Sequence, residues 1–110
     1  MNNDISKLHS KLNMKDILSA EYLRRNHPLY PLICYTNNII ALYLSSNYEN
    51  IPLIINRAYE VIVSTSKHYE NELCVRNVLE YLRLISKFLI SINLEKELLD
   101  LIPKQLAKNE

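Results

Sequence analysis

The sequence predicts an all-α fold, a compact helical bundle of four long helices plus one or two short ones, in a single domain over residues 1–110. The chain contains no glycine, the residue that most readily adopts the positive φ angles of tight turns. Apolar residues recur at every third or fourth position, the spacing of an amphipathic helix. Many of the thirteen asparagines lie near the points where these patterns start and stop, and Asn favours helix ends.

Two helices are expected before Pro28. Asp4 can cap a short helix over 5–12, and Asn13 can cap a second over 14–26, because their side-chain oxygens accept hydrogen bonds from amides of the first turn. The second helix should end before Pro28, since a proline disfavours helical backbone in the residue that precedes it.

A third helix is predicted from Pro31, which suits a first helical turn, to about Ser46. Near both of its ends this segment is apolar almost all round, and such a helix is usually buried on all sides. Either it forms the centre of the bundle or part of it faces another chain, and both alternatives remain open at this point.

The fourth and fifth helices carry the clearest apolar stripes. The fourth is expected to follow the capping residue Asn50 and to end near His68, and the fifth to span 72–92. A short connection makes them antiparallel neighbours. Charged residues on the fifth helix predict a solvated, salt-bridged face. The stripes are Ile51, Ile55, Ala58, Ile62 and Thr65, then Val75, Val78, Leu82, Ile85, Leu89 and Ile92, and the charged residues are Arg76, Glu80, Arg83 and Lys87.

A sixth helix is predicted from Leu94 to about Lys108, with Asn93 as its cap. Pro103 should kink this helix or restart it, because proline lacks the amide that an interior helical position needs. Its apolar stripe favours docking on its own bundle, and helix-in-groove binding to a partner is the alternative.

The two cysteines, Cys34 and Cys74, lie in apolar helical stretches, which predicts two buried free thiols, with a disulfide between helices as the alternative. The net charge of +1 provides no general attraction for polyanions. The Leu29–Leu44 stretch is too short and polar to span a bilayer, and the N-terminus lacks the apolar core of a signal peptide. We therefore expect no membrane association and an intracellular, cytoplasmic location.

No catalytic machinery is expected. Without glycine there can be no phosphate-binding P-loop, dinucleotide fingerprint or nucleophile elbow, because each needs glycine at fixed positions. The three histidines are not spaced to share a metal on one helix face. The sequence therefore predicts a protein that is not an enzyme and that uses no metal or cofactor. The abundance of Ile, Asn, Lys and Tyr suggests an AT-rich genome, and hence a viral or mobile-element source.

Eight tyrosines provide the main indication of function, because Tyr is enriched at the centres of protein interfaces. Together with the apolar third helix, they predict a non-catalytic protein-interaction module, acting as a regulator, inhibitor or assembly subunit, that associates with itself as a dimer or larger oligomer. The candidate interface residues are Tyr30, Tyr35, Ile39, Tyr43, Tyr48, Leu98 and Ile102.

Nucleic-acid binding is the alternative function. Helices over 14–46 could form a helix-turn-helix unit, with Thr36 and the two asparagines after it reading bases and a basic cluster contacting phosphates. The candidate residues in the 7–38 region are Lys11, Lys15, Arg24, Arg25, Asn37 and Asn38. Two prolines in the turn, the apolar character of the third helix and the nearby acidic residues count against this reading.

Overall fold

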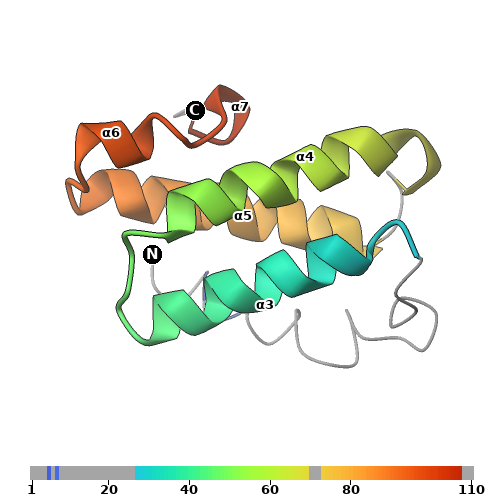
Figure 1. Cartoon of the computed structure of the whole chain (residues 1–110), viewed down its shortest axis with the longest axis horizontal. Helices are drawn as coiled ribbons and strands as arrows, with labels where there is room; N and C mark the ends of the chain where they lie inside the picture. Colours follow the sequence, from blue (N-terminus) through green and yellow to red (C-terminus); the bar gives the residue numbers. More distant parts are fainter. Residues whose placement is uncertain (1–4, 6, 8–26, 70–72, 108–110) are drawn as a thin grey trace.

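A computed structural model of the chain describes residues 5, 7, 27–69 and 73–107, and these residues form helices joined by turns, with no strand among them (Figure 1). The all-α prediction is confirmed. Three of the helices in this part of the chain are long, and the expected helices over 5–12 and 14–26 lie almost wholly outside it, so a fourth long helix stays a prediction. The helices are α3 (Tyr30–Leu44), α4 (Ile51–Tyr69), α5 (Leu73–Ser91), α6 (Lys96–Leu99) and α7 (Lys104–Ala107).

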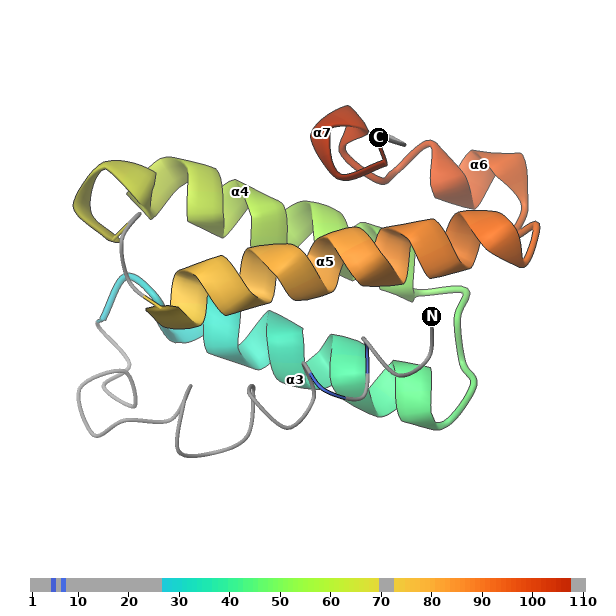
Figure 2. The same cartoon turned by 180° about the vertical axis from the view of Figure 1, so that it is seen from behind.

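The three long helices lie side by side, with α4 antiparallel to both α3 and α5 (Figures 1 and 2). The short helices α6 and α7 lie on the opposite side of the α4–α5 pair from α3, where α6 packs on α4 and α7 packs on α5. The α3–α4 loop and the α5–α6 turn therefore meet at the same end of the bundle.

The core forms between the predicted stripes. On α5, Leu82, Ile85 and Leu89 are fully buried, and on α4 the first four stripe residues are buried as well. These predictions are confirmed for α4 and α5, whose boundaries fall within about a residue of those expected. There are two exceptions. Thr65 is only partly buried, and Ile92 is 38% exposed because α5 ends at Ser91 and leaves Ile92 in the turn.

Helix α3 buries one face and exposes the other. Its buried residues are Leu32, Ile33, Thr36 and Ile39. Cys34 is exposed, so the prediction of a buried thiol is wrong at this position, although the thiol is free. A residue two positions after Leu32 points about 200° away from it around a helix, so the apolar neighbours of Cys34 do not bury it. The helix is therefore not enclosed on all sides, so the prediction that it forms the fully buried centre of the bundle is wrong.

Two buried hydroxyls bond within their own helices. The Thr36 hydroxyl donates to the Leu32 carbonyl at 2.7 Å, and the Ser86 hydroxyl donates to the Leu82 carbonyl at 2.7 Å. Each hydroxyl donates its hydrogen bond to the backbone carbonyl four residues earlier in the same helix. Both polar side chains can therefore lie in the core without an unpaired donor.

Two helices end in the same left-handed turn. Ser46 and Asn93 have φ angles of 62° and 57°. After α3, the amides of Ser46 and Asn47 donate to Tyr43 and Leu42 carbonyls, and after α5 the equivalent pair of bonds is present. This is the Schellman arrangement, which satisfies the last carbonyls of a helix.

Asn93 thus ends α5 and does not cap a sixth helix, so that prediction is wrong. The N-cap position of α6 is Glu95. Asn suits both roles, because its side chain can cap a helix and its backbone tolerates positive φ.

The predicted 94–108 helix is divided into α6 and α7. Pro103 lies directly before α7 and restarts the helix there. The Asn56 side-chain amide of α4 donates to the Leu101 carbonyl at 3.0 Å, which ties this irregular segment to the bundle.

Candidate protein-interaction surface

Three aromatic rings meet at the end of the bundle where α3 and α5 both terminate. Tyr43 lies in the last turn of α3, Tyr48 in the α3–α4 loop and Phe88 in the last turn of α5. The Phe88 ring centroid lies 5.3 Å from that of Tyr43 and 5.2 Å from that of Tyr48, both edge to face. The two tyrosine centroids are 6.2 Å apart. These distances and angles are typical of stabilising aromatic pairs, so the cluster joins α3, the loop and α5.

The turn after α3 positions Tyr48. The Asn47 amide nitrogen lies 2.9 Å from the Leu42 carbonyl oxygen, and the Asn47 side-chain amide donates to the Ser45 hydroxyl at 3.1 Å. These bonds accompany the sharp turn at Ser46, whose φ is 62°, and the chain then runs through Tyr48 into α4. The short loop is therefore held by hydrogen bonds as well as by the rings.

Burial disfavours ionisation of two phenol groups of the bundle, those of Tyr43 and Tyr81. Partial burial, with a smaller contribution from neighbouring Tyr48, raises the pKa of Tyr43 above its ordinary value. Tyr81, fully buried on α5, has its pKa raised further, again mainly by burial and then by Tyr43. Removing water disfavours the phenolate. The Tyr43 phenol therefore stays uncharged at physiological pH.

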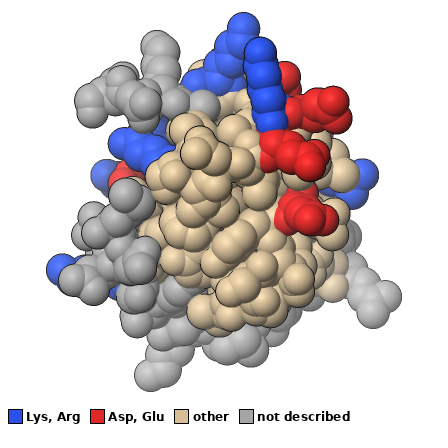
Figure 3. All heavy atoms as spheres, turned by 90° about the vertical axis from the view of Figure 1, so that its left-hand side faces the viewer, with Lys and Arg blue, Asp and Glu red and all other residues tan. Residues whose placement is uncertain are grey.

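Two aliphatic side chains are exposed at the same end. Leu44, the last residue of α3, is 69% exposed, and Ile92 after α5 is 38% exposed. We call Tyr43, Leu44, Tyr48, Phe88 and Ile92 the bundle-end surface. In Figure 3, which views this end of the molecule, uncharged residues occupy the centre and acidic residues gather along one edge. The exposed acidic residues of the adjoining loop and α6 are Glu49, Glu95 and Glu97.

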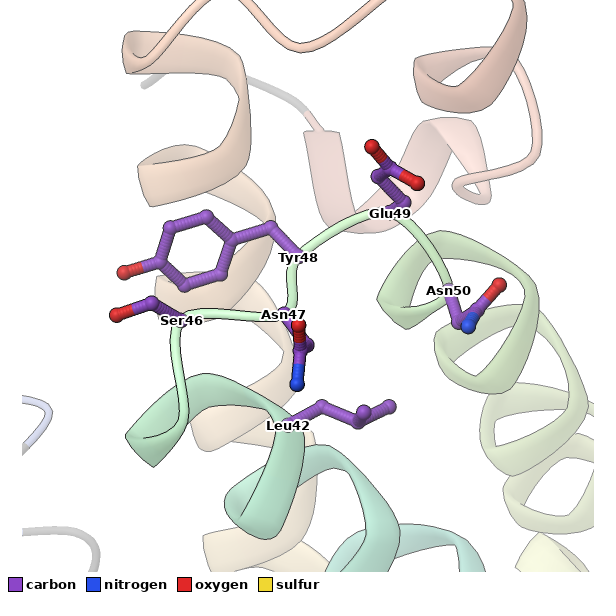
Figure 4. Close-up of a pocket in the computed structure, with 6 residues that line it drawn as sticks. All are labelled: Leu42, Ser46, Asn47, Tyr48, Glu49 and Asn50. Atoms are coloured by element: carbon purple, nitrogen blue, oxygen red, sulfur yellow. The ribbon is translucent and has the colours of Figure 1, made fainter.

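A polar pocket of about 260 Å³ lies beneath the loop, lined by Leu42, Ser46, Asn47, Tyr48, Glu49 and Asn50. In Figure 4 the Leu42 and Asn47 side chains lie under the loop, whereas the Tyr48 ring points away and the Glu49 carboxylate points outward. Among these six residues, Glu49 is the only Asp or Glu, and none is a Lys or Arg. The pocket can offer hydrogen bonds, but these residues include no nucleophile beside a general base.

The predicted interface residues do not form one surface. The structure brings Tyr43 and Tyr48 together, both partly exposed. Tyr30 and Tyr35 are partly exposed nearer the start of α3, and Leu98 is partly exposed on α6.

Ile39 and Ile102 do not belong to any surface. Ile39 is fully buried, and Ile102 is 5% exposed, so both belong to the core and a partner cannot reach them in this conformation. Ile39 lies in the predicted third helix, which is apolar almost all round near its ends, and Ile102 lies on the apolar stripe of the predicted last helix. Apolar residues at helical spacing mark the side that faces the core as often as one that faces a partner.

Sequence reasoning missed Leu44, Phe88 and Ile92 as members of the surface. Phe88 follows Tyr81 by seven residues, a spacing that places both on one flank of α5. The exposure of Leu44 and Ile92 depends on where each helix stops, which is the least predictable feature of a helix.

The nucleic-acid candidates are only partly described. Asn37 and Asn38 are exposed on α3, whereas Lys11, Lys15, Arg24 and Arg25 lie outside the described residues. Thr36 is fully buried, with its hydroxyl bonded within α3, so it cannot read a base edge in this conformation.

Within the part of the chain that the structure describes, no helix combines the length and apolarity needed to cross a bilayer. Over the same residues, no three His, Cys, Asp or Glu side chains gather in a group that could hold a metal ion. Comparison with known proteins finds no matching family model, no matching curated protein and no matching solved structure.

Proposed function

We propose that this chain is a non-catalytic protein-interaction module that associates with itself through the bundle-end surface. The observation that carries the proposal is the 69% exposure of Leu44, which directly follows Tyr43 of the aromatic cluster in the sequence. A leucine side chain gains about 1.5–3 kcal/mol when it is transferred fully from water into a protein environment.

The character of the surface supports a protein partner. Tyrosines provide large contact areas at a small cost in conformational entropy. Tyr and Trp are enriched among the residues that contribute most of the binding energy at protein interfaces. The rings are already held by one another and by the turn at Ser46, so they lose little further freedom on binding.

The absence of charge at the centre of this surface favours a second copy of the chain as the partner. In a two-fold dimer the same patch lies on both sides of the interface, so a charged centre would repel itself. The centre seen in Figure 3 is uncharged, and the acidic residues lie along one edge. The net charge of +1 also produces little general repulsion between copies.

Leu44→Glu tests the proposal with little disturbance of the fold, because the side chain is already mostly in water. Tyr43→Glu is a poorer choice, since it would place a carboxylate against the Phe88 ring. Val63→Glu is the matched control. Val63 is 56% exposed on α4 and lies about 18 Å along that helix from its first turn at the bundle end.

The molecular mass in solution is measured by sedimentation equilibrium across roughly 1–100 µM, the range in which moderate dimers dissociate. We expect the native protein and Val63→Glu to form dimers and Leu44→Glu to remain monomeric. A native protein that is monomeric throughout this range, or a Leu44→Glu variant that dimerises as well as the native protein, would contradict the proposal.

A further inference from the structure

A second candidate site lies on the flank of the molecule, in a groove of about 230 Å³ between α4, α5 and α7. The residues that matter are Ile62 and Val63 from α4, Leu79 and Arg83 from α5, and Gln105 and Leu106 from α7. Three separate helices build this groove, so its shape depends on the tertiary fold.

The groove combines an apolar base with a polar rim. Ile62 and Leu106 are 6% and 1% exposed and so lie at its base, whereas Val63 is 56% exposed at its mouth. Arg83 and Gln105 supply hydrogen-bond donors at the exposed rim. This composition suits one apolar side chain accompanied by a hydrogen-bond acceptor.

The charge beside the groove is mainly positive. Arg76 lies seven residues before Arg83 and Lys87 lies four after it, so the three cations share one side of α5. Glu80 pairs with Arg83 at 4.0 Å, the outer limit for an ion pair, and both side chains are about half exposed at 51% and 53%. Such a pair contributes little energy, so the Arg83 guanidinium can exchange Glu80 for a better placed carboxylate.

We propose that this groove docks an acidic amphipathic segment of another protein. One apolar side chain of the segment enters between Ile62 and Leu106, and a neighbouring carboxylate accepts hydrogen bonds from Arg83. A guanidinium can bind a carboxylate through two parallel hydrogen bonds, which gives direction as well as attraction. The cations on α5 select against a basic segment. Because the groove is remote from Leu44, this docking does not depend on self-association.

The test is selection of a random peptide library, displayed on phage, against the immobilised full chain. The affinity of the selected peptides is then measured for variants of the chain, and the folding of each variant is checked by circular dichroism. Val63→Glu places a carboxylate at the mouth of the groove, and Arg83→Gln removes the cation. Arg57→Gln is the matched control, because Arg57 is an exposed cation of α4 that does not line the groove and does not belong to the bundle-end surface.

We expect enriched peptides to carry an apolar residue beside Asp or Glu. Their affinity should fall about tenfold or more on Val63→Glu, at least threefold on Arg83→Gln, and by less than twofold on Arg57→Gln, because a desolvated apolar contact contributes more than a half-exposed ion pair. Three results would each overturn the proposal: no enrichment of any peptide, enrichment of basic peptides, or an unchanged affinity of the enriched peptides for Val63→Glu. The proposal would also be overturned if the native protein forms a dimer and, among the variants, only Val63→Glu is monomeric. A second copy of the chain would then occupy the groove.

Discussion

Leu82→Ala is the sharpest test of the packing of the bundle. Leu82 lies near the middle of α5 and is fully buried, with its stripe neighbours Val78 and Ile85 buried one turn to either side. The Ser86 hydroxyl bonds to the Leu82 backbone carbonyl, a bond that the substitution leaves in place. The change therefore removes side-chain packing alone.

The expected loss follows from the atoms removed. Leu82→Ala deletes three carbon atoms, worth about 0.8 kcal/mol each on burial, or about 2.4 kcal/mol together. The cavity left behind adds roughly 1 kcal/mol, because close-packed neighbours collapse only partly into it. We expect the free energy of unfolding to fall by about 3–4 kcal/mol. For a domain of this size the total is about 5–15 kcal/mol.

The assay is urea unfolding at equilibrium, followed by circular dichroism, together with the melting temperature. The melting temperature should fall by about 10–20 °C, at several degrees per kcal/mol for a domain of this size. Leu53→Ala is the matched control, because Leu53 is 41% exposed on α4 and should cost below about 1 kcal/mol. A loss below about 0.5 kcal/mol for Leu82→Ala would refute the reasoning, since α5 would then not face a core.

Three further predictions concern individual residues. Ser46→Gly should raise the free energy of unfolding by about 0.5–1 kcal/mol in the urea assay, because glycine adopts a φ of 62° without steric cost. Asn56→Ala removes the hydrogen bond to the Leu101 carbonyl and should cost about 1 kcal/mol, with faster amide hydrogen exchange around α6 and α7. The third concerns alkaline pH. Folding raises the pKa of Tyr43 and Tyr81, so the folded state holds these protons more tightly than the unfolded chain. The contribution of these two phenols to the free energy of unfolding is fully present below the ordinary phenol pKa of about 10, and it is lost as the pH rises above that value. Unfolding measured across that range should show this loss, and Tyr81→Phe should reduce it.

The sequence predicted the parts of the fold that depend on helical periodicity. The stripes of α4 and α5 extend over several turns, and burial follows them closely because a helix repeats its faces regularly. The same reasoning fails at Cys34, because the apolar composition of the neighbouring sequence does not decide burial and this residue lies on the outer side of α3.

Helix ends were harder to predict than helix faces. Asn93 was assigned as the start of a helix and instead ends one, since Asn can fill either position. The ring cluster was harder still, because Tyr48 and Phe88 lie forty residues apart in the chain and meet only through the tertiary fold. Only the two tyrosines of the bundle-end surface were identified beforehand, and the aliphatic residues beside them depend on the positions of two turns.

Self-association through the bundle-end surface is tested most directly by nuclear Overhauser effects between two copies of the chain. Isotopically labelled and unlabelled protein are mixed, and only effects between the two kinds of chain are recorded. We predict effects between the methyl groups of Leu44 or Ile92 in one copy and the Tyr48 ring in the other. Intermolecular effects confined to another surface, or none at concentrations where the native protein is fully soluble, would contradict the account.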